Sequence, residues 1–406
     1  LADDAVTTPK IVNDAVTTPK IVNDAVTTAK IVNDAVSTPK IIDNAVSTPK
    51  IINDAVTTVK IADANVTTAK IADDAVTLTK LENNVTGKLG NRNKIINGEM
   101  RIAQRGTSPV TTNGAYVVDR FRQFVDTQGA VSFQRQKADV PAGFNYALKA
   151  VVTTADATTD ADNTWGLSQT IESDNLADLM FGTANAKPVT LSFWVKSSVA
   201  GVYCATVRNN EANNSADVRC FVSEYTINSA NTWEYKTITV TGDTTGTWDV
   251  ADDKGLVVIF SLTGGTNKQG TAGSWGGYAD CSSNQTQLLE TLNATWFLTG
   301  VQLEMGANAT PFEYRDYAQE IIRCQRYFRK EYCNIRFSGG AYAEQALSFP
   351  PMRVAPTVTN TTNTLVNLIF LSFLNITDFG CRVSALSNTA GDAYALSQVL
   401  HLSAEF

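Results

Sequence analysis

Four aromatic side chains lie in polar stretches rich in glycine or aspartate, and they are the clearest candidates for binding chemistry. Trp275 and Tyr278 are in GTAGSWGGYADCSSNQT (270–286), Trp248 is in TTGTWDVADD, and Trp165 is in DADNTWGLSQ. A sugar ring has C–H groups on its faces and hydroxyl groups around its edge, so it binds to flat aromatic rings with polar neighbours. We predict a carbohydrate-binding site at Trp275 and Tyr278, with Trp248 and Trp165 as further candidates. The alternative is that each ring covers an edge of the hydrophobic core.

The residue types on which most enzymes depend are scarce. His401 is the one histidine, which excludes most Ser/His and Cys/His catalysis and most zinc sites. Glycoside cleavage needs two carboxylates on a rigid scaffold, and we interpret Glu304 and Glu313 as structural instead. The aspartates of DATTDADN (156–163) lack the order of an EF-hand, so we expect a solvated loop rather than a calcium site. We therefore predict no enzyme activity, no metal and no cofactor.

The six cysteines show no C-x-x-C spacing and no metal-binding pattern. Cys204 and Cys220 flank a segment typical of a β-hairpin, so a cross-strand disulfide between them is one hypothesis. Free, half-buried thiols are the alternative that we favour.

Composition narrows the class of protein. The 406 residues are 43% hydrophobic and 18% charged, and the net charge is −7. A charged share this low, with Thr, Asn, Ala and Gly in its place, is typical of extracellular β-proteins and fibres. There is no basic block and no apolar run near the ~20 residues of a membrane span, so we expect neither a nucleic-acid partner nor membrane insertion. The first residue is Leu1 instead of Met, and we expect a further N-terminal piece.

A decapeptide repeat fills the first part of the chain. Val recurs every ten residues from Val6 to Val76, and Ile recurs in the same way from Ile11 to Ile71. An apolar residue thus appears every five positions. In a flat strand successive apolar residues would face opposite sides, and in a helix they would not stay on one face. The Thr-Thr-Pro steps also oppose helix. We expect an extended unit with a turn at each Asn-Asp pair.

Such a unit cannot bury its own apolar side chains. Two arrangements would cover these side chains: three identical chains wrapped around one axis, or one chain coiled into a small β-solenoid. We favour the homotrimer, because the capping units that a solenoid needs are not evident. The repeat would then be a spacer whose length grows by copying one unit.

Residues 95–313 alternate apolar and polar residues in short runs that Gly, Asn and Asp separate. PVTLSFWVKSS (188–198) places four apolar side chains on one face, Val189, Leu191, Phe193 and Val195. In TWEYKTITVTGD (232–243), Tyr235 is on the opposite face to Ile238. We predict further strands in GLVVIFSLTGG (255–265) and ATWFLTGVQLEMG (294–306). Many short strands with such turns predict an antiparallel β-sandwich.

Two longer runs resemble a sandwich domain of bacteriophage tail-fibre proteins. NKIINGEMRIAQRGTS (93–108), followed by YVVDRF (116–121), resembles the opening of that domain, and TGVQLEMGANATPFEYRDYAQEIIRCQRYF (299–328) resembles the signature that closes it. The decapeptides are also similar to repeats of phage fibres. The resemblance covers about residues 95–360 and implies a jelly-roll-like sandwich, similar to carbohydrate-binding modules, in a virion fibre. It places Trp248 in the family pattern, which favours a structural role for that residue.

After the sandwich we expect one helix and a small β-domain. Asp316 and Gln319 form a capping-box pattern, and Tyr317, Ile321, Cys324 and Phe328 share one helical face. The fold class is all-β apart from this helix. The predicted organisation is a shaft (1–86), a hinge (87–94), a sandwich domain (95–313), a connecting helix (314–330) and a β tip domain (331–406).

These observations together predict a homotrimeric phage tail fibre of the virion that attaches to host cells by binding surface glycans. The missing N-terminal piece would bind other virion tail proteins. Two alternatives stay open. One is a structural virion fibre or adaptor, on capsid or tail, without a receptor; the other is a tailspike that cleaves polysaccharide.

Overall fold

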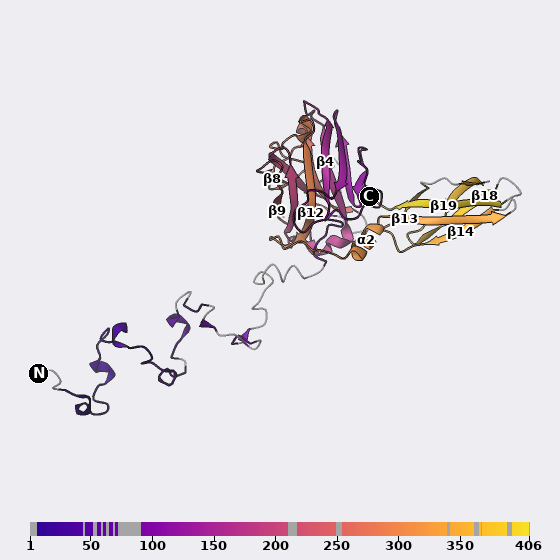
Figure 1. Cartoon of the computed structure of the whole chain (residues 1–406). Helices are drawn as coiled ribbons and strands as arrows, with labels where there is room; N and C mark the ends of the chain where they lie inside the picture. Colours follow the sequence, from indigo (N-terminus) through magenta and orange to yellow (C-terminus); the bar gives the residue numbers. More distant parts are fainter. Residues whose placement is uncertain are drawn as a thin grey trace. The chain divides into compact units, whose positions relative to one another are not determined.

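The computed structural model describes residues 6–43, 45–51, 55–57, 60–61, 65–67, 70–71, 91–209, 217–248, 254–338, 342–360, 365–366, 368–387 and 392–405. The chain divides into two compact units, Leu1–Lys80 and Leu81–Phe406 (Figure 1). None of the helices within these described ranges is long and apolar enough to cross a membrane.

The first unit repeats one backbone conformation every ten residues. In the described part of the unit, each of these 3-10 helices is a single turn: η1 (Thr8–Lys10), η2 (Thr18–Lys20), η3 (Thr28–Lys30), η4 (Thr38–Lys40) and η5 (Thr48–Lys50). Proline fits at the start of such a turn because the first N–H groups of a helix have no partner there. The Thr-Pro-Lys step therefore adds a second turn to the extended unit that we expected. Asp14, Asp24 and Asp34 have φ between 62° and 66°, which makes the predicted turn at each Asn-Asp pair.

Apolar side chains of this unit are uncovered within one chain. Val12 is 72% exposed, Val16 56% and Ile21 46%, and closely similar values recur in later repeats. None of the described residues of the unit is buried. The lysines from Lys20 to Lys70 instead reach back to a carbonyl oxygen, as Lys20 Nζ does to Ala15 O at 2.6 Å. The repeat fixes its backbone locally and leaves its Val and Ile side chains exposed.

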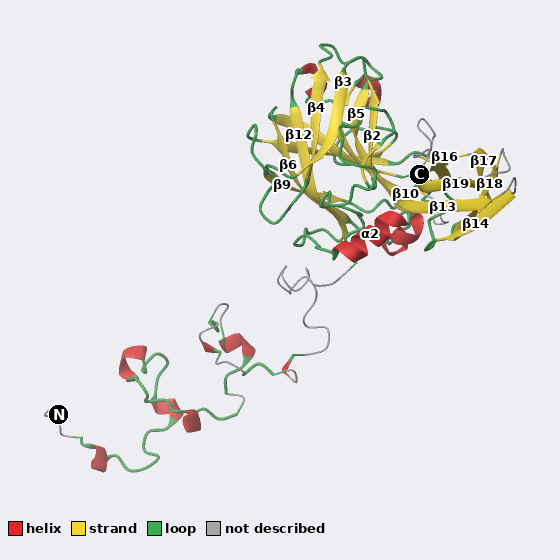
Figure 2. Ribbon diagram, turned by 45° about the vertical axis from the view of Figure 1, so that its right-hand side comes forward, coloured by secondary structure: helices red, strands yellow, loops and turns green. Residues whose placement is uncertain are grey.

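Two antiparallel sheets form a β-sandwich in the second unit, which confirms the predicted fold class (Figure 2). One sheet has the order β1-β2-β5-β10-β7-β8-β11 and the other the order β3-β4-β12-β6-β9. The first sheet consists of β1 (Tyr116–Val118), β2 (Phe121–Asp126), β5 (Thr164–Glu172), β10 (Lys254–Gly264), β7 (Gly201–Arg208), β8 (Cys220–Ile227) and β11 (Trp275–Gly276). The second consists of β3 (Ala130–Gln136), β4 (Ala147–Thr154), β12 (Thr295–Met305), β6 (Val189–Ser197) and β9 (Glu234–Val240). Short 3-10 helices connect some of them: η9 (Ser173–Leu179), η10 (Thr266–Lys268) and η11 (Leu288–Glu290).

The predicted apolar phase of β6 faces the core between the sheets. Its four apolar side chains, Val189, Leu191, Phe193 and Val195, are at most 1% exposed. Phe193 packs edge to face against Tyr225 and Phe260 of the opposite sheet, with ring centroids 5.0 Å apart in each pair. Burying one such side chain contributes about 1.5–3 kcal/mol. The same alternation places Trp194 on the outer face of the sheet.

The cysteines agree with the free-thiol alternative. β7 and β8 form the predicted hairpin, but Cys204 lies opposite Glu224 and Cys220 opposite Arg208. Both thiols are free, as are Cys281, Cys324 and Cys381. The side chain of Cys333 lies outside the described residues.

The chain enters the sandwich earlier than the sequence predicted. The N–H groups of Asn91 and Asn93 each donate to a carboxylate oxygen of Glu313 at 2.7 Å. Asn93 is also buried, with 3% exposure. Residues 91–94 are therefore packed on the sandwich instead of forming part of a hinge. The remainder of the predicted hinge, residues 87–90, lies outside the described residues.

The helix that follows the sandwich is shorter than expected. α2 spans Tyr317–Gln325, and its N-cap Asp316 makes no side-chain capping hydrogen bond, so the capping box with Gln319 does not form. Phe328, which we placed on the helical face, begins strand β13 (Phe328–Ser338) and pairs with Ser403. The end of the predicted helix at residue 330 is therefore wrong. Local periodicity could not reveal this, because the partner strand lies near the end of the chain.

Two further sheets build a small C-terminal β-domain (Figure 1). One has the order β13-β19-β15, with β16 beside β19, and the other has the order β14-β18-β17. The strands are β14 (Tyr342–Ser348), β15 (Thr357–Asn360), β16 (Leu365–Val366), β17 (Leu368–Leu374), β18 (Gly380–Ser387) and β19 (Asp392–Ser403). Met352, Val383, Leu400 and Leu402 are at most 1% exposed in its core.

A buried ion network connects this domain to the sandwich. The guanidinium of Arg120 pairs with Glu405 and lies 3.4 Å from the centroid of the Tyr327 ring. Arg105 Nη2 donates to the other oxygen of Glu405 at 3.2 Å. The side chains of Arg120 and Glu405 are 1% and 5% exposed, so their charges depend on each other rather than on water.

Candidate functional site

Of the four aromatic residues predicted to bind carbohydrate, Trp165 is enclosed in the core. Its side chain is 0% exposed, and its ring lies 5.8 Å from the ring of Phe133 in the opposite sheet. Trp165 belongs to β5, which lies between β2 and β10, and its side chain points between the two sheets. The prediction for Trp165 is therefore wrong, because a ring without exposed surface cannot contact a glycan.

Trp248 and Trp275 pack together at one edge of the sandwich. Their rings meet edge to face at 5.6 Å, and Phe181 lies 4.7 Å from Trp248 and 5.8 Å from Trp275. Trp275 Nε1 donates to Thr241 O at 2.7 Å, and Trp248 Nε1 donates to Asp243 Oδ2 at 3.2 Å. The rings of both tryptophans thus pack against other rings of the protein, and their N–H groups donate to protein oxygens. This favours the alternative that both residues cover an edge of the core.

Tyr278 belongs to a separate polar cluster. Its hydroxyl donates to Asp280 Oδ2 at 3.0 Å, and the cationic groups of Arg208 and Lys268 lie 5.4 Å and 5.5 Å from its ring centroid. Burial and the charge of Asp280 raise the pKa of Tyr278, so the hydroxyl remains a donor at neutral pH. Tyr278 is half-buried, and its role as a glycan contact stays a prediction.

A groove of about 480 Å³ on the outer face of the five-stranded sheet exposes a different set of aromatic rings. Trp194 of β6 and Tyr235 of β9 are opposite each other in the register, and their rings are 5.4 Å apart. Tyr235 is 43% exposed. Ser192 and Thr237 are the next pair on this face along the same two strands. The floor of the groove thus combines two large rings with two hydroxyl groups.

Three more rings form a wall of the groove. Phe312 and Tyr314 come from the segment after β12, and Phe144 comes from the loop before β4. Their ring centroids lie 5.0–5.8 Å from one another. Phe144 is 7% exposed and anchors the group, whereas Tyr314 is 58% exposed. An exposed tyrosine held by one buried and one half-buried ring is a rigid surface for a ligand ring.

Gly300 of β12 makes room for this wall. It has a φ of 62°, and a Cβ atom at this position would lie 2.6 Å from Cζ of Phe144. The register between β12 and β6 shifts between Thr299 and Gln302, so the strand bulges beneath the groove. Bulges of this kind re-aim side chains next to functional sites.

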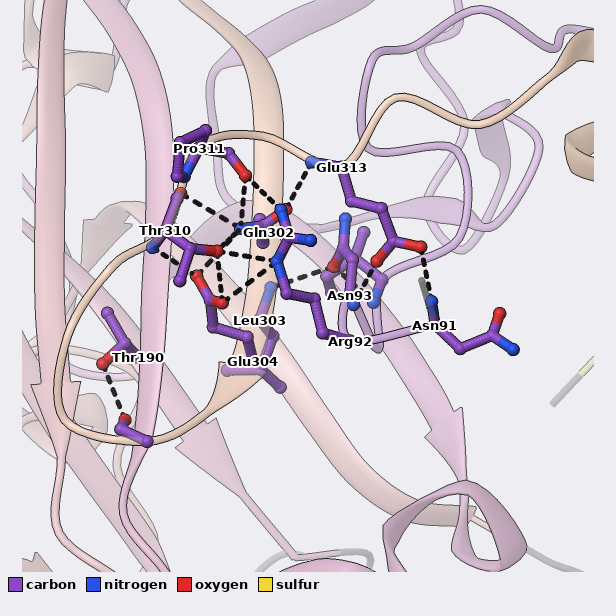
Figure 3. A network of polar contacts seen from close by, with 12 residues as sticks. Asn91, Arg92, Asn93, Thr190, Gln302, Leu303, Glu304, Thr310, Pro311 and Glu313 are labelled. Carbon is purple, nitrogen blue, oxygen red and sulfur yellow. Dashed lines mark hydrogen bonds and ion pairs between the residues drawn. The ribbon is translucent and has the colours of Figure 1, made fainter. Parts of the chain in front are cut away.

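Polar contacts fix the segment that carries the wall (Figure 3). Glu304 accepts hydrogen bonds from Thr310 N at 2.9 Å, Thr310 Oγ1 at 2.6 Å and Gln302 Nε2 at 2.8 Å. Arg92 Nε lies 3.4 Å from Glu304 and donates to Thr310 Oγ1 at 2.7 Å. Glu304 is 2% exposed. This geometry agrees with the structural role predicted for Glu304 and, through its contacts with residues 91 and 93, for Glu313.

Charged groups beside the groove are engaged with one another. Lys196, which follows Trp194 on the outer face of β6, is 4% exposed and pairs with Asp139. The hydrogen bond from Lys196 lowers the pKa of Asp139. On β9, burial alone would raise the pKa of Glu234, but hydrogen bonds from Lys236 and the preceding turn lower it to about 2. These contacts hold the edges of the groove and leave its lining uncharged.

The described side chains that line the groove are uncharged. Its described lining residues include no carboxylate, so a glycosidase mechanism with two carboxylates has no candidates there. Within the described ranges, no group of three or more His, Cys, Asp or Glu side chains could hold a metal ion. In the acidic loop, Asp156 accepts hydrogen bonds from backbone N–H groups, and Asp162 accepts one from Asn267 at 2.9 Å.

Sequence reasoning missed the groove, although part of its signal was present. Trp194 occupies the solvent phase of a strand whose other phase is apolar, and Tyr235 lies on the face of its strand opposite Ile238 and Val240. A large ring on a solvent phase is a sign of a binding surface when two such rings lie side by side. Phe312 and Tyr314 gave no such signal, because PFEYRDY has no period and its partners lie far away in the sequence.

Comparisons with known proteins return no matching family model and no matching curated protein. Among solved structures, the chain is similar to the enzymatically active domain of tailspike protein 4 of bacteriophage CBA120, with 14% identity and a TM-score of 0.27. That match covers 52% of this chain and 21% of the tailspike chain, so it spans about a fifth of that protein.

Two carbohydrate-binding modules are similar over about half of the chain. A family 11 module from Clostridium thermocellum, in complex with a β-1,3-1,4-mixed-linked tetrasaccharide, has 14% identity and a TM-score of 0.26, covering 51% of this chain and 99% of the module. The CBM22-2 xylan-binding domain from Paenibacillus barcinonensis Xyn10C has 12% identity and a TM-score of 0.27. This match covers 49% of this chain and 98% of the xylan-binding domain. We base the function on the residues of this chain rather than on these likenesses.

Proposed function

We propose that this chain is a subunit of a bacteriophage tail fibre that attaches the virion to a glycan on the host cell surface. The observation that carries the proposal is the groove with the Trp194–Tyr235 floor and the Phe312–Tyr314 wall. It combines exposed ring faces with hydroxyl groups, which is the chemistry that sugar rings need. No bond is made or broken in this function, so the groove needs no nucleophile and no general acid.

Binding would proceed by stacking. The C–H face of a sugar ring lies on Trp194 or Tyr235, and its hydroxyl groups exchange hydrogen bonds with side chains such as Thr237. A single site of this kind is weak. Linking several sites on one particle raises the overall affinity by roughly 10²–10⁴ through effective concentration. A fibre with several heads therefore holds a cell that one groove would release.

We propose that the repeats join three chains into the shaft of this fibre. The support is the periodic exposure of Val and Ile, which no other part of the described repeat covers. A surface that repeats every ten residues is covered along its length by a partner with the same period, and an identical chain has that period. Sedimentation of the full chain tests this: a trimer is expected, and a monomer at micromolar concentration would contradict it.

The decisive experiment is binding of the fluorescently labelled full-length chain to a panel of bacterial cells, before and after periodate oxidation of their surface sugars. Binding that periodate abolishes is expected for at least one strain. Trp194→Ala should then weaken binding by about 2 kcal/mol, or roughly thirtyfold. Tyr332→Ala is the matched control, because Tyr332 is 69% exposed on β13, outside the groove.

Each other outcome points to a different function. Binding that survives periodate and the Trp194 substitution but is lost with Tyr332→Ala would move the receptor site to the C-terminal domain. Absence of binding to all strains by a folded oligomer would favour a structural fibre or adaptor. Release of reducing ends from cell-surface polysaccharide would establish a cleaving tailspike instead.

A further inference from the structure

We infer that the groove selects neutral glycans over glycans that carry a carboxylate or a sulfate. This inference rests on the proposed function and specifies the class of ligand. The described residues that line the groove are of eight types, Ala, Phe, Ser, Trp, Tyr, Thr, Gly and Pro, and none of these side chains is charged at neutral pH. An anionic sugar would therefore find rings and hydroxyl groups but no counter-charge.

The lysines of the two strands that form the floor, β6 and β9, are committed to carboxylates of the protein. Lys196 is paired with Asp139, and its side chain is 5% exposed beneath Trp233 and Phe297, whose ring centroids lie 5.3 Å and 4.3 Å from its ammonium group. Lys236 lies on the other phase of β9 and donates to Glu234 at 2.6 Å.

A further cation near the groove, Arg92, contacts the segment that carries the wall. It lies against Glu304, and its side chain is 13% exposed. Arg92 also donates to Thr310 and to the carbonyl oxygen of Pro311, which are both lining residues. Moving this guanidinium toward a ligand would break the contacts that hold the wall in place.

Desolvation then decides between neutral and anionic sugars. A carboxylate that enters the groove loses water, and without a counter-charge among the described lining residues this cost is not recovered. A neutral sugar has only hydroxyl groups to desolvate, and protein hydroxyl groups both donate and accept hydrogen bonds. Thr237, Tyr235 and Tyr314 supply such groups on the exposed side of the groove. Burial and the charge of Glu99 raise the pKa of Tyr314, so its hydroxyl stays neutral.

A glycan array that contains neutral oligosaccharides and acidic counterparts, differing by one carboxylate or sulfate, tests this inference with the full-length chain. We expect neutral members to bind, their acidic counterparts to bind at least about tenfold more weakly, and binding to change little between low and high salt. Thr237→Lys adds a cation at the floor of the groove and should raise binding of acidic members. Thr237→Gln is its matched uncharged control.

The outcomes separate the two levels of the proposal. Binding of acidic members in preference to neutral ones, or binding that salt abolishes, overturns the charge selection and leaves glycan attachment standing. Binding of neutral members that Trp194→Ala leaves unchanged also overturns the inference, because another surface then makes the contact. An array without any bound member, together with cells that do not bind, overturns the proposed function itself.

Discussion

Removing the carboxylate of Glu405 should uncouple the C-terminal β-domain from the sandwich. Glu405 contacts two arginines, Arg120 and Arg105, and the side chains of Arg120 and Glu405 are at most 5% exposed. Breaking a buried pair by removing one partner typically costs about 3–5 kcal/mol, because a buried charge is left without its counter-charge. Glu405→Ala should show this full cost. Glu405→Gln keeps one acceptor oxygen and should lose about half of it.

The chain contains reporters that distinguish the two domains. All six tryptophans lie between Trp165 and Trp296, so their fluorescence follows the sandwich and not the C-terminal domain. Hydrogen exchange of peptides from β13 and β19 follows the other side of the junction. In Glu405→Ala we expect these peptides to exchange roughly a hundredfold faster or more, while the tryptophan transition moves less.

An exposed ion pair in the same domain is the control. Arg382 Nη1 lies 2.9 Å from Glu344, with side chains 48% and 31% exposed, and pairs of this kind contribute about 0–1 kcal/mol. Glu344→Ala should therefore change exchange little. If Glu405→Ala and Glu344→Ala unfold alike, the junction does not depend on the buried charges and our reasoning about it is wrong.

Two further substitutions test the frame of the groove. Gly300→Ala places a Cβ 2.6 Å from Phe144 Cζ, at a φ of 62°. We therefore expect the free energy of unfolding in denaturant to fall by about 2–4 kcal/mol and glycan binding to weaken. An unchanged unfolding midpoint would show that Phe144 moves aside freely. Glu234 has its pKa lowered from 4.5 to about 2 in the folded chain, so its contribution to stability is complete above pH 4.5 and is lost as the pH falls toward 2. Glu234→Gln should make thermal stability depend less on pH between these two values. Glu224→Gln, on strand β8 of the other sheet, is the control. An equal loss of stability in acid for the wild type and Glu234→Gln would exclude this role.

The sequence by itself determined the local elements. Strict alternation in β6 assigned Val189, Leu191, Phe193 and Val195 to the core, and the spacing of Val and Ile in the repeat excluded a regular helix or flat strand. These inferences succeed because side-chain direction along a strand depends on position alone. The presence of a single histidine and the absence of C-x-x-C spacing likewise excluded most zinc sites and most histidine-dependent catalysis without any coordinates.

Only the tertiary structure decided which rings remain exposed. Trp165 has polar neighbours in sequence, yet the sheet opposite covers it. Trp194 has apolar neighbours, yet it is only half-buried and lines the groove. Phe328 has a helical spacing, but pairing with Ser403 places it in a strand. The physical reason is common to all three. Burial and pairing depend on segments that lie far apart in the chain and meet only after folding, whereas periodicity reports only which way a side chain points.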